Sequence, residues 1–308
     1  MKMDFEFVGK AIGVVILVLV LLFFLTWGGI VKCNQVPYWC DIYESVMGGP
    51  RALIVYGDSG LGDPEHLKTI LQDPQGVAAP AVDMLSIERL SLGNLKQYEL
   101  VIVEKSRKIS IDQLEMFMNY AQQGGRLIWI ADAGVEKGDD EVQNLADVNE
   151  LSQFSKNPWA RARDNGEDFT PVLFDQFLGL SYIGNYCELV SCAETPFSVG
   201  VLKTEPTGNH PLIFGTSPVL NFKISRSRGF SVVKQFANSS NTNIVLSAEF
   251  GGNIKTKDNK DLGKSSPIIV TSGMGERVAY YAYPPEYFHE DNNYFGLVKK
   301  MYYGMLGK

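Results

Sequence analysis

The chain has 308 residues, a formal net charge of −7 and 45% hydrophobic residues. That length is ample for one sizeable globular core with an appended segment. The acidic balance, without a cluster of Lys and Arg, argues against a nucleic-acid partner, because binding to phosphates depends on basic side chains. It also argues against docking onto anionic lipid headgroups.

An apolar run without charged side chains covers residues 11–31. As a helix it would be roughly 31 Å long, which matches the hydrocarbon core of a bilayer. Trp27 suits the headgroup region, and Lys32 follows where a signal peptide would carry a cleavage site of small residues. We therefore expect a cytoplasmic N-terminus over residues 1–10 and a transmembrane helix over residues 11–31, with the lipid bilayer as a partner. A buried core helix is the alternative.

The four cysteines form two close pairs, Cys33 with Cys40 and Cys187 with Cys192. Each pair spans a short, loop-like stretch, which favours two disulfides. Zinc binding by the same four residues is the alternative, although neither pair has the usual zinc-ligand spacing. Disulfides persist outside the reducing cytoplasm, so we expect the C-terminal domain on the outer side of the cell membrane. A glycosylation sequon at Asn238 would be usable only there.

A connector over residues 32–50 precedes the folded domain. From residue 51 the chain repeats a pattern of a buried strand, a turn and a helix, which is typical of a parallel α/β sheet. Two helices begin with capping residues, Asp63 before Pro64 and Ser110 with Gln113. The chain therefore predicts a doubly wound, mostly parallel sheet with helices on both faces. The predicted strands are 52–56, 81–87, 99–103 and 126–131.

The repeated pattern of strand, turn and helix ends after Asp132. Residues 134–200 are interpreted as an insertion, with a helix predicted over 171–180. A β-rich C-terminal extension follows, closed by a helix over 293–306. Its candidate strands lie at 201, 212–214, 230–233, 244–246, 267–271 and 277–283.

The order of these segments resembles the class I glutamine amidotransferase-like superfamily, in particular its trehalose-utilisation type. The matching segments are 52–58, 98–103, 114–130, 174–180, 209–212 and 275–281. The resemblance implies a flavodoxin-like or amidotransferase-like fold over residues 51–306. It also implies that such domains occur beside membrane transport or envelope-assembly machinery, so we expect a protein partner in a complex of that kind. No cofactor is expected.

The resemblance further implies a Cys nucleophile on a strained turn after a central strand. That turn reads Ile130-Ala131-Asp132-Ala133-Gly134, which contains no cysteine. A thiolate is the attacking species in this chemistry, and Asp132 cannot replace it. The partner histidine is also missing from its place. We therefore do not expect amidotransferase catalysis.

Three carboxylates, Asp58, Glu104 and Asp132, each follow a predicted strand. In a parallel sheet they would converge at the carboxyl edge, where α/β proteins bind ligands. Together they could hold a divalent cation or act as acid and base. The alternative is that they are ordinary helix caps and loop residues.

The turn Gly57-Asp58-Ser59-Gly60 is a candidate ligand-binding loop, because its backbone N–H groups could cradle a phosphate. Its glycine spacing matches neither a dinucleotide fingerprint nor a P-loop. Asp58 and Asp63 would also repel an anion. A tight structural turn is the alternative.

These observations favour a non-catalytic, membrane-anchored, extracytoplasmic interaction or ligand-sensing module on a degenerate amidotransferase-like scaffold. One alternative is an envelope-directed or carbohydrate-directed hydrolase that uses the three carboxylates. The other is a structural subunit of a surface filament or membrane complex, in which the apolar helix packs against other helices.

Overall fold

The computed structural model has two compact units, Met1–Gly49 and Pro50–Lys308, which are considered separately. The predicted Cys33–Cys40 disulfide and the sequon at Asn238 lie outside the residues that the structure describes, so both stay predictions. The described residues are 5–27, 36, 39, 42–43, 46, 51–138, 157–164, 169–205, 208–236, 242–273, 275–292 and 294–306.

The first unit contains the helix α1 (Phe5–Trp27). Large apolar side chains along it, from Ile12 to Phe24, are exposed. Within α1 the structure describes the exposure of Gly9 and of residues 12–26. Within the described part of the chain, no helix has the length and apolar character needed to cross a membrane. The transmembrane helix expected over residues 11–31 therefore stays a prediction from the sequence.

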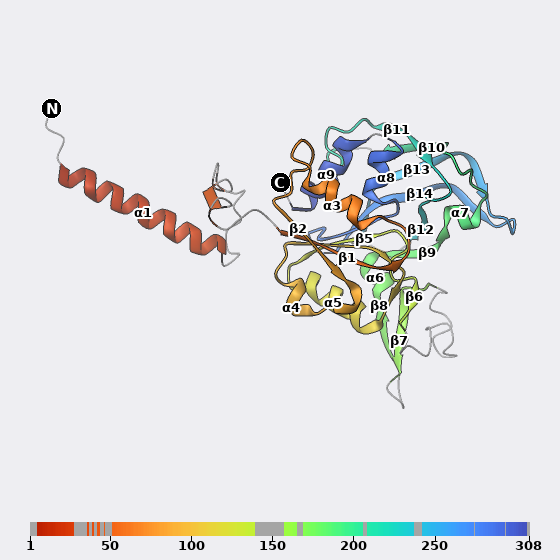
Figure 1. Ribbon diagram of the computed structural model, residues 1–308, viewed down its shortest axis with the longest axis horizontal. Coiled ribbons are helices and arrows are strands. Elements are labelled where there is room, and N and C mark those ends of the chain that lie inside the picture. Colours follow the sequence, from red (N-terminus) through yellow and green to blue (C-terminus); the bar gives the residue numbers. More distant parts are fainter. Residues whose placement is uncertain are drawn as a thin grey trace. The chain divides into compact units, whose positions relative to one another are not determined.

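The second unit is built on a large mixed sheet (Figure 1). Its order is β11-β10-β13-β14-β15-β5-β3-β1-β2. Every neighbouring pair from β2 to β15 is parallel, and every pair from β15 to β11 is antiparallel. The bounds are β1 (Arg51–Ser59), β2 (Ala81–Ser86), β3 (Leu100–Ser106), β5 (Arg126–Ile130), β15 (Val278–Tyr281), β14 (Asp261–Ser272), β13 (Thr242–Lys255), β10 (Phe197–Thr204) and β11 (Val219–Ile224).

The β-rich C-terminal extension is therefore part of the central sheet and not an appendage to it. The parallel strands are the continuous apolar runs found in the sequence, because both faces of this half are covered. In β1, for example, Ala52 to Val55 are all buried. The antiparallel strand β14 joins the two halves by pairing with β15, and β15 pairs on its other side with β5.

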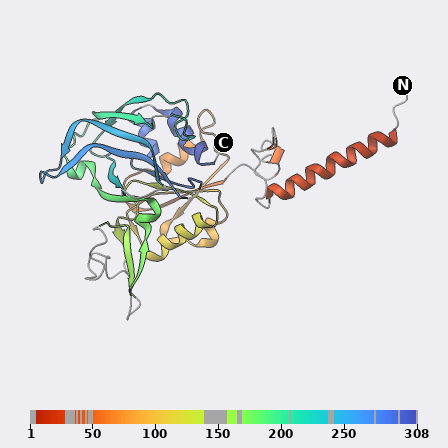
Figure 2. The same ribbon diagram turned by 180° about the vertical axis from the view of Figure 1, so that it is seen from behind.

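Helices cover both faces of the parallel half, as a doubly wound sheet requires (Figures 1 and 2). The helices α3 (Pro64–Gln72), α8 (Pro285–Glu290) and α9 (Phe295–Leu306) lie on one face. On the other face lie α4 (Leu92–Leu95) and α5 (Ile111–Gln122), next to the short helix η2 (Ile87–Arg89). The predicted capping box of Ser110 and Gln113 is confirmed.

The described part of the insertion packs beside the carboxyl edge of the sheet. It contains β6 (Glu136–Lys137), β7 (Ala160–Asp164), β8 (Phe169–Leu173), α6 (Phe174–Leu178), β9 (Leu180–Asn185) and α7 (Tyr186–Leu189). Two partners come from outside the insertion: β4 (Lys108–Ile109) pairs with β6, and β12 (Ser231–Gln235) pairs with β9.

One local prediction is right only in part, and another is wrong. The helix predicted over 171–180 is a strand followed by one helical turn, because the Thr-Pro-Val segment of β8 pairs with β7 and favours extended backbone. The strand predicted over 212–214 is a turn, in which Leu212 and Ile213 are buried. Apolar burial alone does not separate a strand from a packed turn.

The predicted disulfide between Cys187 and Cys192 is confirmed, with 5.3 Å between the two Cα atoms. Because both thiols are used in this bond, zinc binding by this pair is excluded. The disulfide closes a short loop that begins in α7.

Candidate functional site

A glycine-rich loop at the carboxyl edge of β1 passes between two buried carboxyl groups. At Gly60, with φ of 120°, a Cβ atom would lie 3.0 Å from Oδ1 of Asp132. At Gly62, with φ of 118°, a Cβ atom would lie 2.9 Å from Oε2 of Glu104. Glycine is thus required at both positions by the backbone conformation and by the close approach. This supports the structural interpretation of the loop between residues 57 and 62.

Asp132 is buried and anchors this loop. Its Oδ1 accepts a hydrogen bond of 2.8 Å from the backbone N–H of Leu61. Its Oδ2 lies 3.4 Å from Nη1 of Arg107. Burial raises the pKa of Asp132, against the opposing effects of the Leu61 N–H and the Arg107 charge. Asp132 therefore ties the β1 loop to the end of β5.

Glu104, at the end of β3, is fully buried and faces α8. Neither of its carboxyl oxygens has a hydrogen-bond partner among the described residues. Burial, together with the charges of Glu286 and Asp63, raises the pKa of Glu104 well above its ordinary value. Burial therefore favours the neutral form of Glu104.

Glu286, in the first turn of α8, is the buried neighbour of Glu104. Its Oε1 accepts a hydrogen bond of 2.7 Å from the backbone N–H of Asp63, while its Oε2 has no partner in the described part of the chain. Burial, more than the charges of Asp63 and Glu290, raises the pKa of Glu286 to about 8. The sequence contained a signal for this residue, since Glu286 follows β15, whose carboxyl end lies at the same edge.

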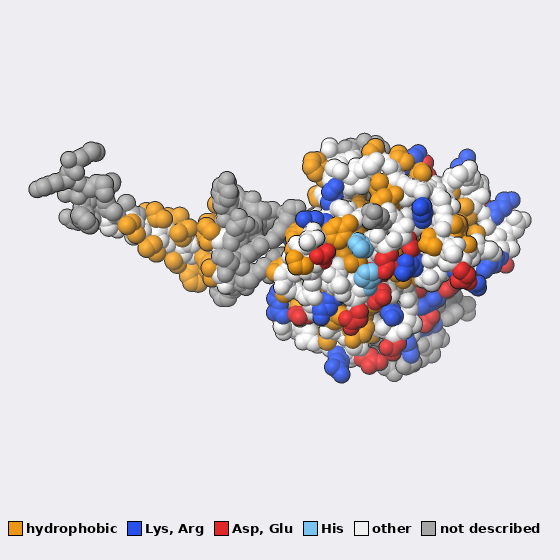
Figure 3. Space-filling model, turned by 45° about the horizontal axis from the view of Figure 1, so that its top comes forward, with side chains coloured by type: hydrophobic (Ala, Val, Ile, Leu, Met, Phe, Trp, Pro, Cys, Tyr) orange, Lys and Arg blue, Asp and Glu red, His pale blue; other side chains and the backbone are white. Residues whose placement is uncertain are grey.

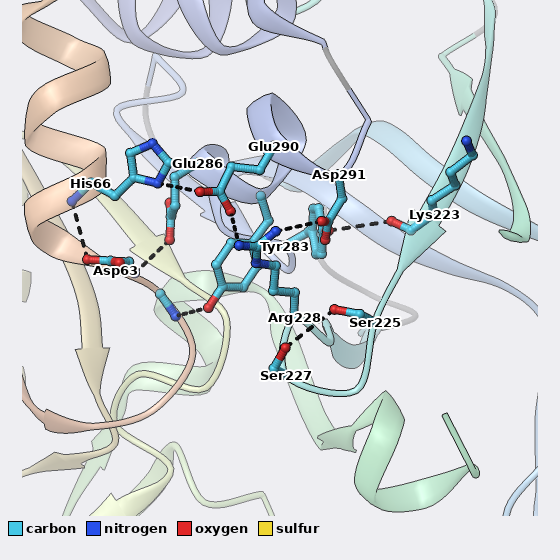
Figure 4. A network of polar contacts seen from close by, with 12 residues as sticks. Asp63, His66, Lys223, Ser225, Ser227, Arg228, Tyr283, Glu286, Glu290 and Asp291 are labelled. Atoms are coloured by element: carbon cyan, nitrogen blue, oxygen red, sulfur yellow. Dashed lines mark hydrogen bonds and ion pairs between the residues drawn. The ribbon is translucent and has the colours of Figure 1, made fainter. Parts of the chain in front are cut away.

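Polar contacts hold α8 against α3 and against the loop after β11 (Figure 4). Nδ1 of His66 lies 2.7 Å from a carboxylate oxygen of Glu290. Arg228 contacts Glu290 and also lies 2.7 Å from Asp291. The hydroxyl of Tyr283 donates a hydrogen bond of 3.0 Å to Asp291.

Acidic and basic side chains are interspersed on the surface shown in Figure 3.

Asp58 is exposed and lies in a different environment from Glu104 and Asp132. It lines a cavity of about 370 Å³ between the ends of β1, β2 and β3 and the start of α5. The predicted ligand-loop residues Gly57 and Ser59 also line this cavity, and Gly60 is not among its lining residues. The three candidate carboxylates thus share one sheet edge but have different partners. Among the described side chains, no group of three or more His, Cys, Asp or Glu is placed to hold a metal ion.

The strained turn after β5 is present, but its strained residue is Ala131 and not Asp132. Ala131 has φ of 52°, in the left-handed region that residues other than glycine rarely adopt. Its N–H donates to the carbonyl of Tyr281 at 2.7 Å, and its carbonyl accepts from the Tyr280 hydroxyl at 2.9 Å. In strained strand-to-helix turns of hydrolases this position carries the nucleophile. Here it carries a methyl group.

Side chains of β5 and of the insertion donate hydrogen bonds to the carbonyls of this turn. The indole N–H groups of Trp129 and Trp159 both donate to the carbonyl of Ala133, each at 2.9 Å. Arg161 donates to the carbonyls of Gly134 and Glu136. Trp159 and Arg161 are both fully buried. The carboxyl edge above β5 is therefore closed by the insertion.

No family model and no curated protein matches the sequence. Among solved structures, the chain is similar to a ThuA-like protein from Bacteroides uniformis, with a TM-score of 0.54 and 14% identity, covering 84% of this chain and 93% of the other. A β-galactosidase from Rahnella sp. R3 is matched with a TM-score of 0.50 and 12% identity, covering 87% of this chain but only 32% of the enzyme. PurLQS from Thermotoga maritima gives a TM-score of 0.47 and 14% identity, covering 84% of this chain and 98% of the other.

At such low identities these likenesses show the fold alone. The chain shares a mixed α/β fold, built on a large central sheet, with the ThuA-like protein. What the matched proteins bind or catalyse does not follow for this chain.

Proposed function

We propose that this protein is a non-catalytic module that senses a ligand or binds a partner protein, built on a degenerate amidotransferase-like scaffold. The observation that carries the proposal is the turn after β5. Its strained position holds Ala131, which is fully buried, and the buried side chains of Trp159 and Arg161 donate hydrogen bonds to the carbonyls of Ala133 and Gly134 just after it. An acyl-transfer site needs both a nucleophile and open space for the substrate carbonyl, and both are missing at this turn.

A direct test compares the natural protein with the variant Ala131→Cys in assays of glutamine hydrolysis. We expect no activity from either protein, because position 131 is fully buried and a thiol there would not reach a substrate. Thiol titration of the folded variant serves as the control, and should show slow modification. Release of ammonia from glutamine by the natural protein would disprove the proposal.

We further propose that the second unit lies outside the cytoplasm and is tethered to a membrane through residues 11–31. The Cys187–Cys192 disulfide supports the location, since such bonds persist in oxidising compartments. The apolar, exposed side chains of α1 support the tether. Labelling of intact cells with a membrane-impermeant reagent tests both, and protection of the second unit from that reagent would contradict the location.

The partner is expected in a membrane or envelope complex. Mild crosslinking of cells followed by purification of the full chain tests this expectation. A chain that remains monomeric and without a partner would count against an interaction module. Crosslinks between copies through α1 alone would favour the alternative of a structural subunit in a filament or membrane complex.

A hydrolase acting on an envelope component or carbohydrate is the second candidate, because buried carboxyl groups with raised pKa values often mark functional sites. Glu104 and Asp132 meet this description. The combined variant Asp58→Asn, Glu104→Gln, Asp132→Asn separates the two functions while preserving side-chain shape. A folded variant that keeps its biological function eliminates the hydrolase.

A further inference from the structure

The cavity beside Asp58 has a buried hydroxyl group in its wall. Ser106, the last residue of β3, is only 1% exposed and lines this cavity. Its Oγ has no hydrogen-bond partner among the described residues. A buried hydroxyl without a partner has lost its hydrogen bonds to water, which costs free energy unless a ligand or a bound water forms a hydrogen bond with it.

The backbone at Lys105 directs Ser106 into the cavity. In a regular strand, residues two apart point to the same face, so Glu104 and Ser106 would share one face. Lys105, however, has φ of 49°, and the pairing of β1 with β3 shifts register at this point. As a result Glu104 lies beside Glu286 of α8, whereas Ser106 faces the cavity near α5. Strained residues of this kind persist where the surrounding structure enforces them, and they cluster at functional sites.

Gly57 allows this arrangement. A Cβ atom at position 57 would lie 3.2 Å from the carbonyl oxygen of Lys105 and 3.2 Å from both Cα and Oγ of Ser106. Any larger residue would press on the serine and narrow the cavity. The glycine that opens the β1 loop therefore preserves the space in which the Ser106 hydroxyl is offered.

Two further hydroxyl groups in the wall are held in position by helix ends. Ser110 Oγ accepts from the backbone N–H of Gln113 at 3.3 Å, and Ser86 Oγ accepts from that of Glu88 at 3.4 Å. Because each oxygen accepts from its own helix, its O–H proton can be donated to a molecule in the cavity. Ser59 adds a fourth hydroxyl at the rim.

The charges in the wall select against anions. Asp58 and Glu88 supply two carboxylates, and Lys108 supplies one ammonium group. A phosphate or sulfate would meet repulsion from both acids. A molecule with several hydroxyl groups can donate to the carboxylates and accept from the serines at once. The volume of about 370 Å³ lies within the usual range of small-molecule sites.

We propose that this cavity binds a neutral polyhydroxylated small molecule, such as a sugar or a polyol, with Ser106 as the buried contact. This inference rests on the ligand-sensing function proposed above and names its ligand class. The carboxylates of Asp58 and Glu88 accept hydrogen bonds from the ligand. The hydroxyls of Ser86, Ser106 and Ser110 donate hydrogen bonds to its oxygen atoms.

The test uses the full chain in a detergent without a sugar headgroup. Calorimetry and ligand-observed NMR are carried out with glucose, galactose, mannose, myo-inositol and glycerol, and with inorganic phosphate as the anion probe. We expect at least one neutral probe to bind, with an affinity that added salt leaves unchanged. We expect Ser106→Ala to weaken that binding by roughly tenfold, the equivalent of one good hydrogen bond.

A matched control is Ser266→Ala, because Ser266 is also 1% exposed and its Oγ also lacks a partner in the described part of the chain. Ser266 lies in β14, away from the cavity, so its variant should bind normally. Preferred binding of phosphate, binding by none of the neutral probes, or equal binding by the Ser106 and Ser266 variants would each overturn the inference.

Failure of this inference is distinguishable from failure of the proposed function. If no probe binds while the chain still captures a partner and hydrolyses nothing, the ligand assignment falls and the interaction module stands. If a sugar probe binds and the chain also hydrolyses a glycoside of that sugar, the site stands and the non-catalytic function falls.

Discussion

The replacement Glu286→Gln should stabilise the second unit at neutral pH. Burial raises the pKa of Glu286 from an ordinary 4.5 to about 8. Folding at pH 7 therefore costs this carboxyl group about 3 kcal/mol, taking about 1.36 kcal/mol per pKa unit over the interval from 4.5 to 7. Glutamine has the shape of the protonated acid and can still accept from the N–H of Asp63, so it avoids this cost.

The pH dependence gives the sign of the effect. Between pH 4.5 and 8 the folded protein holds a proton at Glu286 that the unfolded chain has lost, so stability falls as the pH rises through this window. The stability that the proton on Glu286 contributes is fully present below about pH 4.5 and is lost above about pH 8. The variant should be more stable by about 3 kcal/mol at pH 7 and nearly equal to the natural protein at pH 4.5.

Urea denaturation of the full chain at several pH values between 4.5 and 9 measures this difference. The matched control is Glu88→Gln, because Glu88 is an exposed residue of η2. It should leave the pH dependence unchanged. If Glu286→Gln lowers the stability by the same amount at every pH, the carboxyl group is ionised in the fold and the reasoning is refuted.

Three further changes test the rest of the site by their effect on the free energy of unfolding. Gly62→Ala should cost about 3 kcal/mol or more, since φ of 118° and a contact of 2.9 Å with Glu104 both oppose a Cβ atom; a loss below 1 kcal/mol in urea denaturation would contradict this. Arg161→Met should cost about 3 kcal/mol, because buried carbonyl groups lose their donors, and thermal denaturation checks it. Replacing both Cys187 and Cys192 by Ser should cost about 2 kcal/mol, the entropy of a short closed loop, and reducing agent should then no longer change the melting temperature of the second unit.

The parallel half of the sheet could be predicted because short stretches of the sequence are enough to identify its strands and helices. Strands buried on both faces appear as unbroken apolar runs, as in β1 and β3, and the capping box at Ser110 marks the start of α5 by itself. The strand β8 was mistaken for part of a helix because its apolar spacing fits both, and only its pairing with β7 decides.

The sequence predicts parts of the antiparallel strands β10, β13 and β14, but it predicts neither β11 nor the place of these strands in the sheet. Partner choice depends on contacts far apart in sequence, such as the register that sets Val278 beside Leu127. No local pattern in the sequence indicates that β14 and β13 extend the parallel half of the sheet by antiparallel pairing. The sequence therefore predicts a β-rich C-terminal extension but not that its strands join the central sheet.

The candidate site was predicted in part. Asp58, Glu104 and Asp132 do lie at the carboxyl edge, because the end of a parallel strand determines the edge. The face to which each side chain turns depends on Lys105 and on the glycines of the β1 loop, and the sequence alone does not give these backbone angles. Glu286 was missed because its strand β15 comes last in the chain and enters the sheet beside β5.

The turn at Ala131 also has a consequence for the order of folding. Its carbonyl groups are satisfied by donors from distant segments, since the contact with Tyr280 spans 149 residues and those with Trp159 and Arg161 span 26 and 27. A left-handed residue is costly until such contacts form, and contacts of high sequence separation form slowly. We therefore expect the turn to form late in folding, after the C-terminal strand and the insertion have packed against it.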